Sequence, residues 1–127
     1  MHNYAYMKTA ANFFKLLADP TRYRILHALA QGEFCVCELV DAVRAPQYTV
    51  SRHLAGLRKA GWVTERRDGT WIYYRLPPER ANLVKDMIHL ASKHGLDARA
   101  LAADVKRLQK RLALREDGRC LLGYGEV

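Results

Sequence analysis

One stretch, residues 47–75, constrains the fold of this chain more than any other. Its sequence, QYTVSRHLAGLRKAGWVTERRDGTWIYYR, predicts a helix that ends at a glycine and is followed by a two-stranded hairpin with an Asp-Gly turn. Val50, Leu54 and Leu57 recur at helical spacing and give the helix one apolar face. The opposite face is polar and basic. A helix of this kind followed by a basic hairpin indicates a protein that reads nucleic acid.

The charge of the chain supports the same interpretation. The net charge is +8 at pH 7, and residues 44–75 hold seven Lys or Arg against two acidic residues. A basic patch on one helix and one hairpin favours a polyphosphate partner. The chain has no apolar run of about eighteen residues or more, and its first residues lack the pattern of a secretion signal. We therefore expect a cytoplasmic protein, no membrane partner, and reduced cysteines.

The remainder of the chain predicts a mainly helical protein with one small β-hairpin. Apolar periodicity and end signals predict helices over residues 4–17, 20–30, 36–43, 47–60, 79–94 and 97–115. The helices over 36–43 and 47–60 are joined by a tight turn, and the second is polar outside. This pair predicts a helix-turn-helix.

Four segments in this order carry a resemblance to a known family: LADPTRYRIL, EFCVCEL, TVSRHLAGLRKAGWV and GTWIYYRL. The chain resembles the ArsR/SmtB family of metal-responsive winged-helix repressors over about residues 10–92, and its Cys-Val-Cys resembles the arsenic-responsive branch. The resemblance implies a winged helix-turn-helix fold and a homodimer built from the first and fifth helices. It also implies binding to palindromic double-stranded operator DNA, which is released when an inducer binds. We expect residues 1–95 to form this domain with its dimerisation helices, and 96–127 to form an extra helix and a flexible tail.

Cys35 and Cys37 are the candidate inducer ligands, because two thiolates suit a soft, thiophilic ion. Residues two apart diverge on a helix but share a face in extended chain, so both sulfurs can hold one ion only outside regular helix. We expect chelation to distort the first turn of the helix over 36–43, which supports the recognition helix. The resemblance implies arsenite or antimonite, which prefers three sulfur ligands. Cys120 is a candidate third ligand, and a small thiol or water is the alternative; other thiophilic ions remain possible.

The chain departs from the family pattern in two respects. A third cysteine three residues after the pair is replaced by Val40, and the spacing of Asp86, His89 and His94 does not match the zinc-sensing branch. One alternative function is a thiol redox-sensing repressor of the same fold, switched by a disulfide involving Cys120. Another is an architectural DNA-binding protein whose cysteines are core residues. No triad-like arrangement and no Gly-rich phosphate loop is present, so we expect no catalytic residue, no catalytic cofactor and no enzyme.

DNA contacts are expected on the recognition helix and on the wing, the hairpin that follows it. The predicted residues are Gln47, Tyr48, Thr49, Ser51, Arg52, Arg66, Arg67 and Thr70. Arg52 is the predicted base reader, whereas the wing residues are predicted to contact the DNA backbone or minor groove.

The predicted dimer follows from the operator. A palindrome needs two recognition helices about one helical turn of DNA apart, which one domain cannot supply, so we expect a two-fold homodimer. Its interface is predicted on the first and fifth helices, at Phe14, Leu17, Leu83, Met87 and Leu90. The alternative is that these faces are core and that the apolar seam Leu101, Val105, Leu108 and Leu112 on the last helix forms the dimer.

Overall fold

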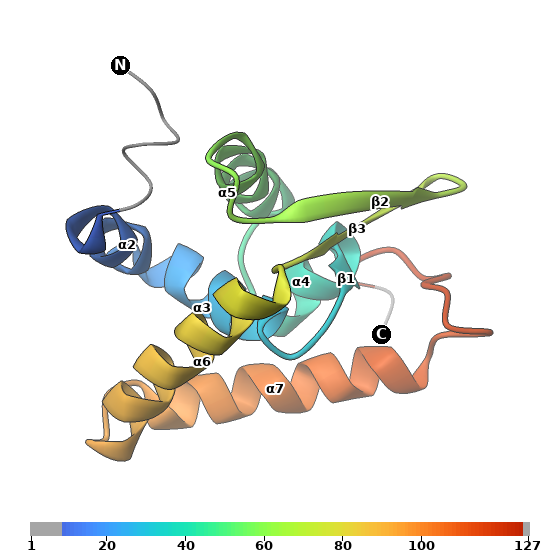
Figure 1. The fold of residues 1–127 in the computed structure, drawn as a ribbon. Coiled ribbons are helices and arrows are strands. Elements are labelled where there is room, and N and C mark those ends of the chain that lie inside the picture. Colours follow the sequence, from blue (N-terminus) through green and yellow to red (C-terminus); the bar gives the residue numbers. More distant parts are fainter. Residues whose placement is uncertain (1–8, 126–127) are drawn as a thin grey trace.

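A computed structural model of the chain describes residues 9–125, and Figure 1 shows their arrangement. The elements are α2 (Ala10–Leu17), α3 (Pro20–Leu29), β1 (Phe34–Cys35), α4 (Val36–Val43), α5 (Gln47–Lys59), β2 (Thr64–Asp68), β3 (Trp71–Arg75), α6 (Pro78–Lys93) and α7 (Ala98–Ala113). This confirms the mainly helical fold with a small hairpin. The part of the first helix predicted over residues 4–8 lies outside the described residues. Within the described part of the chain, no helix is long and apolar enough to cross a membrane.

The sheet has one strand more than the sequence predicts. It is antiparallel with the order β1-β3-β2. The predicted hairpin pairs β2 with β3, whereas β1 pairs with the other edge of β3, with Cys35 opposite Tyr73. A strand of two residues has no periodicity that a sequence pattern could reveal. Because of this strand, the Cys-Val-Cys segment is joined directly to the wing.

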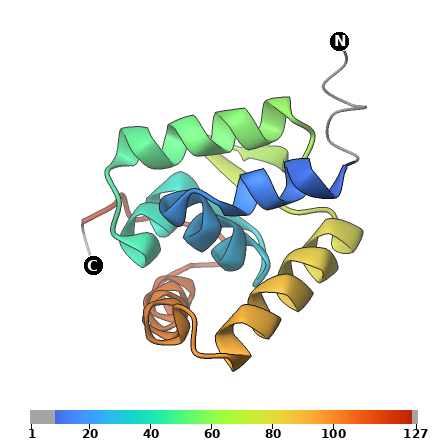
Figure 2. The ribbon, with the colours of Figure 1, turned by 90° about the vertical axis from the view of Figure 1, so that its left-hand side faces the viewer.

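The helix-turn-helix consists of α4 and α5, as predicted. The turn between them begins at Arg44, which adopts a left-handed conformation with φ 53° and caps the end of α4. The predicted apolar face of α5, Val50, Leu54 and Leu57, is at most 1% exposed and packs into the core. The opposite face of α5 is left open to solvent (Figure 2).

Helix α2 carries two adjacent phenylalanines, of which Phe14 is among the predicted dimer residues. Phe13 is 6% exposed and stacks on Trp62 at a centroid distance of 5.4 Å, whereas Phe14 is 51% exposed. Two adjacent phenylalanines of one helix cannot both face the core of the domain, since successive residues on a helix point about 100° apart. The core therefore takes Phe13 and leaves Phe14 on the surface.

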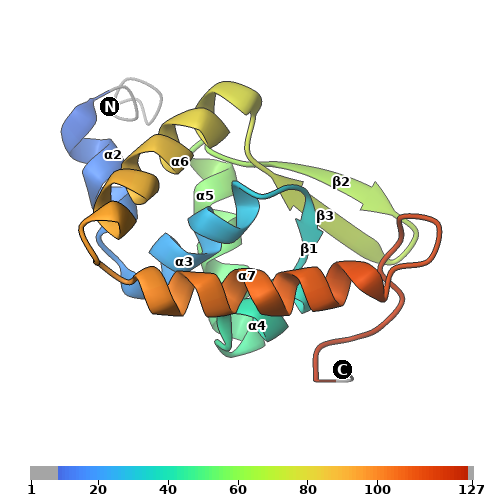
Figure 3. The ribbon, with the colours of Figure 1, turned by 90° about the horizontal axis from the view of Figure 1, so that it is seen from below.

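Helix α7 packs along α3 and α4, on the side of the molecule opposite α5 (Figures 2 and 3). It buries Leu101 and Leu108 in the common core. Between the helices, the fully buried carboxylate of Asp104 accepts hydrogen bonds from Arg24 and Arg107, each 2.6 Å from Oδ1. Buried charges of this kind are retained only with partners, so the three residues fix how α7 lies on α3. This placement carries the end of α7 to the wing.

Candidate functional site

The two cysteines of the Cys-Val-Cys segment lie on either side of a strand-to-helix junction. Cys35 is the last residue of β1 and the N-cap of α4, with extended backbone angles (φ −85°, ψ 167°). Cys37 is in the first turn of α4. The backbone between the two is therefore not regular helix, which is the condition under which residues two apart can turn toward one ion.

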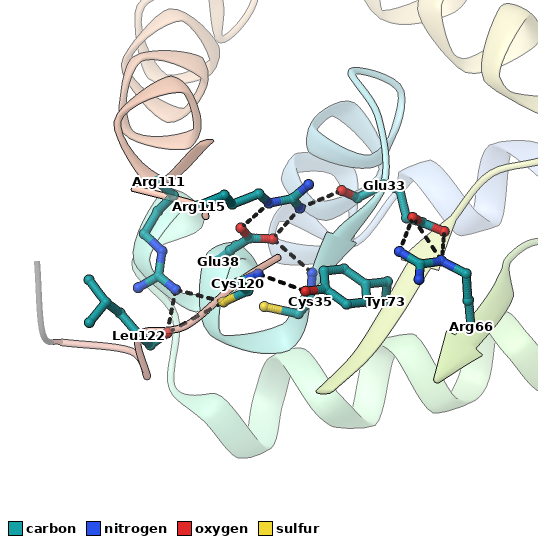
Figure 4. A network of polar contacts seen from close by, with 9 residues as sticks. All are labelled: Glu33, Cys35, Glu38, Arg66, Tyr73, Arg111, Arg115, Cys120 and Leu122. Carbon is teal, nitrogen blue, oxygen red and sulfur yellow. Dashed lines mark hydrogen bonds and ion pairs between the residues drawn. The ribbon is translucent and has the colours of Figure 1, made fainter. Parts of the chain in front are cut away.

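The fold brings Cys120 to Cys35. Their Sγ atoms and a carboxylate oxygen of Glu38 all lie within 4.8 Å of one another, and the three residues are at most 2% exposed. Cys37 is half-buried and packs beside this group without being one of its members. We call Cys35, Glu38 and Cys120 the thiol site, shown in Figure 4. The two sulfurs of the thiol site thus come from the end of β1 and from the C-terminal segment.

Two arginines, Arg111 in the last turn of α7 and Arg115 just after this helix, hold the polar groups of the thiol site. Arg115 donates to both carboxylate oxygens of Glu38 at 2.6 Å, and Glu38 also accepts the N–H of Cys35 at 3.0 Å. Arg111, which is 2% exposed, donates to Sγ of Cys120 at 3.2 Å. Because the Glu38 oxygens are occupied, the sulfurs are the atoms of the site best able to bind a soft ion.

Burial raises the pKa of the Cys35 thiol well above its ordinary value, and the hydrogen bond with Cys120 and the charge of Glu38 act in the same direction. Burial also raises the pKa of Cys37, although a backbone N–H of Tyr124 opposes it. Both groups are therefore protonated thiols at neutral pH. A metal or metalloid that binds them must displace a proton from each sulfur.

The segment after α7 is tied to the rest of the domain around Cys120. The N–H of Cys120 donates to the hydroxyl of Tyr73 at 2.7 Å. Arg111 donates to the carbonyl of Leu122 at 2.5 Å, and its Nη1 lies 2.8 Å from Asp41 of α4. Cys120, in the segment predicted as a flexible tail, is thus buried and hydrogen-bonded in the structure.

Sequence reasoning missed Glu38, Tyr73, Arg111 and Arg115. Glu38 lies three residues after Cys35, which is capping-box spacing, and this could have been recognised. Arg111 lies in the last turn of α7 and Arg115 two residues after its end, and nothing local in the sequence shows what these two side chains contact.

The predicted DNA-reading residues of α5 lie on its solvent side. Gln47, Tyr48 and Arg52 are exposed, and Thr49 and Ser51 are partly exposed. Gln47 donates to the hydroxyl of Ser51 at 2.8 Å, and the Arg52 guanidinium lies 5.9 Å from the Tyr48 ring centroid. The helix therefore presents a polar face with one arginine over an aromatic ring.

The two arginines of the wing differ in their surroundings. Arg66 folds back onto Glu33, with Nη2 and Oε1 2.7 Å apart, and its guanidinium lies 4.6 Å from the Tyr73 ring centroid. Arg67 is exposed, and within residues 9–125 it has no ion pair. Thr70 is exposed beside the turn. Arg67 is thus the wing cation that is available to a phosphate.

The predicted dimer residues form exposed apolar surface on α2 and α6. Phe14, Leu83 and Leu90 are 51%, 41% and 50% exposed, and Leu17 and Met87 are half-buried. By contrast, Leu101 and Leu108 of α7 are buried within the domain.

The histidines of α6 and its end lie away from the thiol site. Asp86, His89 and His94 are exposed and are not part of the group of potential metal ligands found among the described residues.

Comparison with known proteins gives a consistent result. A family profile described as "Bacterial regulatory protein, arsR family" matches residues 19–65. The "Arsenic resistance transcriptional regulator ArsR1" of Pseudomonas putida is 51% identical over 76 residues, 59% of this chain and 59% of that protein. ArsR2 of the same organism is 46% identical over 85 residues, 66% of this chain and 74% of that protein. The match thus spans less than two thirds of the first relative.

A solved structure with the same fold is the homodimeric winged helix-turn-helix DNA-binding domain from Mycobacterium bovis, described as a possible ArsR-family transcriptional regulator. It superposes with a TM-score of 0.61 at 35% identity and covers 71% of this chain and 84% of that one. This confirms the predicted winged helix-turn-helix fold.

Proposed function

Because the chain belongs to the arsR family of bacterial regulatory proteins, which are DNA-binding regulators and not enzymes, we propose that it represses transcription and is induced by arsenite or antimonite. It binds a palindromic operator as a homodimer and releases it when the metalloid binds Cys35 and Cys120. The observation that carries this proposal is the convergence of two buried sulfurs, from separate parts of the chain, within 4.8 Å.

The chemistry of the site suits trivalent arsenic. Arsenous acid carries three hydroxyl groups, and each As–S bond forms as one thiol proton leaves with one hydroxide as water. Cys35 and Cys120 supply the first two sulfurs, and Cys37, which packs beside them, supplies the third after a small rearrangement of the junction between β1 and α4. Each of these exchanges replaces an As–OH bond by an As–S bond, releases one water, and adds no net charge to the buried site.

The position of the thiol site also supports a switch. Cys35 and Cys37 begin α4, and Leu39, Val40 and Val43 of this helix are buried in the core with α5. Distortion of the first turn of α4 therefore changes the support of the recognition helix. A ligand releases DNA only if it binds the two states unequally, and such coupling is typically about 1–3 kcal/mol.

The roles of the two parts of the chain follow. Residues 1–95 hold the recognition helix, the wing and the exposed apolar surface of α2 and α6 that forms the dimer, as the homodimeric relative suggests. Residues 96–127 contribute Cys120 and the two arginines around it. Arg52 on α5 reads a base, and Arg67 on the wing binds a phosphate.

A redox-sensing repressor is the second candidate, because the sulfurs of Cys35 and Cys120 are close enough to approach one another with little movement. In that case a peroxide oxidises the two thiols to a disulfide, with loss of two hydrogens, and is reduced to water.

One experiment separates the candidates. The full chain is bound to a duplex that it has selected from a random pool, and fluorescence anisotropy is followed with arsenite, antimonite, cadmium, zinc or hydrogen peroxide. Release by arsenite, together with an arsenic adduct in native mass spectrometry, is the expected result. Release by peroxide alone, with a mass lower by two hydrogens, supports the redox candidate and contradicts the proposal.

A further inference from the structure

The thiol site lies against the central strand of the wing sheet. The strand order β1-β3-β2 puts β3 between the segment that carries Cys35 and the strand that carries the wing arginines. Tyr73 of β3 is paired with Cys35 on one side and with Arg66 on the other. A single residue of the wing therefore stands between a proposed inducer ligand and a basic strand.

Tyr73 also contacts the second sulfur-bearing residue. Its side chain is completely buried, and its hydroxyl accepts the N–H of Cys120 at 2.7 Å (Figure 4). Tyr73 is thus the ladder partner of Cys35 and the hydrogen-bond partner of Cys120. If an inducer changes the separation of the two sulfurs, either the β1–β3 ladder moves or this hydrogen bond breaks.

A second connection runs through Glu33, the residue before β1. Its carboxylate accepts hydrogen bonds from Arg66 at 2.7 and 3.2 Å, and its carbonyl accepts one from Arg115 at 2.8 Å. The same Arg115 nitrogen is 2.6 Å from Glu38 in the thiol site. The side chain of Arg66 is therefore held by the segment that leads into Cys35.

We propose that the inducer acts on DNA binding through the wing. This inference rests on the proposed function and adds a second route beside the one through α4 and α5: Tyr73 and Glu33 are positioning residues that couple occupancy of the thiol site to the orientation of β2 and Arg66. A bound metalloid draws Cys35 and Cys120 together, β3 shifts with them, and the basic strand leaves its DNA-binding position. In the other route, through α4 and α5, neither Tyr73 nor Glu33 takes part.

The test compares coupling in full-length variants. Tyr73→Phe removes the hydroxyl that accepts the Cys120 N–H and keeps the ring, whereas Tyr74→Phe is the matched control on the same strand, outside the contacts of Cys120. For each variant, the affinity for the selected duplex is measured without and with saturating arsenite. Arsenite binding is measured separately from the ultraviolet absorbance of arsenic–sulfur bonds.

Tyr73→Phe should bind arsenite and reduce the ratio of the two DNA affinities by about fivefold, the equivalent of one hydrogen bond. Tyr74→Phe should leave the ratio within about twofold of wild type, the usual scatter for an uncoupled site. Glu33→Gln is the second variant: it should lower the ratio and, because Arg66 is released, strengthen DNA binding without arsenite.

An arsenite-dependent ratio that is equal in wild type, Tyr73→Phe and Glu33→Gln, with arsenite bound by all three, would overturn the wing route. If Tyr73→Phe fails to fold, Glu33→Gln decides alone, since the Glu33 side chain is 28% exposed and tolerates an isosteric change. If arsenite fails to release DNA from the wild-type chain, the proposed function itself is wrong, and this outcome is visible before any variant is measured.

Discussion

Arg115 and Glu38, although 77 positions apart in the chain, form two hydrogen bonds of 2.6 Å beside the thiols. Glu38 is completely buried, and this guanidinium offsets the cost of removing its carboxylate from water. The pair joins the end of the C-terminal helix region to the first turn of α4. It therefore serves both the stability of the domain and the environment of Cys35.

The first prediction concerns this pair. Arg115→Ala leaves a buried carboxylate without its cation and should lower the free energy of unfolding by about 3 kcal/mol. Urea denaturation followed by circular dichroism measures the change. Arg119→Ala is the control: Arg119 pairs with Asp68 at 3.2 Å but its side chain is 63% exposed, so about 0.5 kcal/mol or less is expected. Equal effects of the two changes would contradict the prediction.

The second prediction concerns the ligands. Cys120→Ser should weaken arsenite binding by at least about tenfold, because oxygen is a poor ligand for a soft metalloid. The double change Cys35→Ser with Cys37→Ser should abolish the response and retain operator binding. Isothermal titration and anisotropy measure the two properties. An unchanged arsenite affinity in Cys120→Ser would exclude the C-terminal segment from the site.

The third prediction concerns the wing arginines. Arg67→Ala should weaken binding to every duplex and lower the slope of log affinity against log salt by about one unit, because one phosphate contact is lost. Arg66→Ala should change the slope less, because the Arg66 guanidinium is already paired with the Glu33 carboxylate. Anisotropy titrations at several salt concentrations give both slopes. A larger change for Arg66 would show that the Glu33 pair opens on DNA.

The fourth prediction concerns base reading. Arg52 is exposed on the outward face of α5. Arg52→Ala should cost about 1–3 kcal/mol on the selected duplex and much less on random duplex, if it forms a bidentate contact with guanine. Competition titrations compare the two duplexes. An equal loss of affinity for both duplexes would show that Arg52 contacts a phosphate and not a base.

The fifth prediction concerns assembly. Leu90→Glu places a charge in the apolar surface of α6, which is 50% exposed at this residue, and should convert the dimer to a monomer. Sedimentation velocity measures the mass. Leu121→Glu is the matched control, because Leu121 is 49% exposed but lies outside the predicted interface. A dimer that survives Leu90→Glu would move the interface to another surface.

Local features of this protein could be predicted from its sequence alone. The spacing of Val50, Leu54 and Leu57 predicted both α5 and its buried face, and the Asp-Gly turn predicted the hairpin. The Cys-Val-Cys segment indicated thiol chemistry. Each of these inferences depends on neighbours within a few residues, where helical or strand geometry fixes which side chains share a face.

The groups that surround the cysteines depend on long-range packing, which no local pattern in the sequence shows. In the folded protein Phe13 is buried and Phe14 is exposed, and β1 pairs with the wing strand β3. Arg66 forms an ion pair with Glu33, and the sulfurs of Cys35 and Cys120 lie close together. These contacts join residues distant in sequence, and no periodicity relates them. They follow from the packing of α7 on α3 and α4, where buried Asp104 must meet Arg24 and Arg107, and this packing sets where the chain after α7 can go.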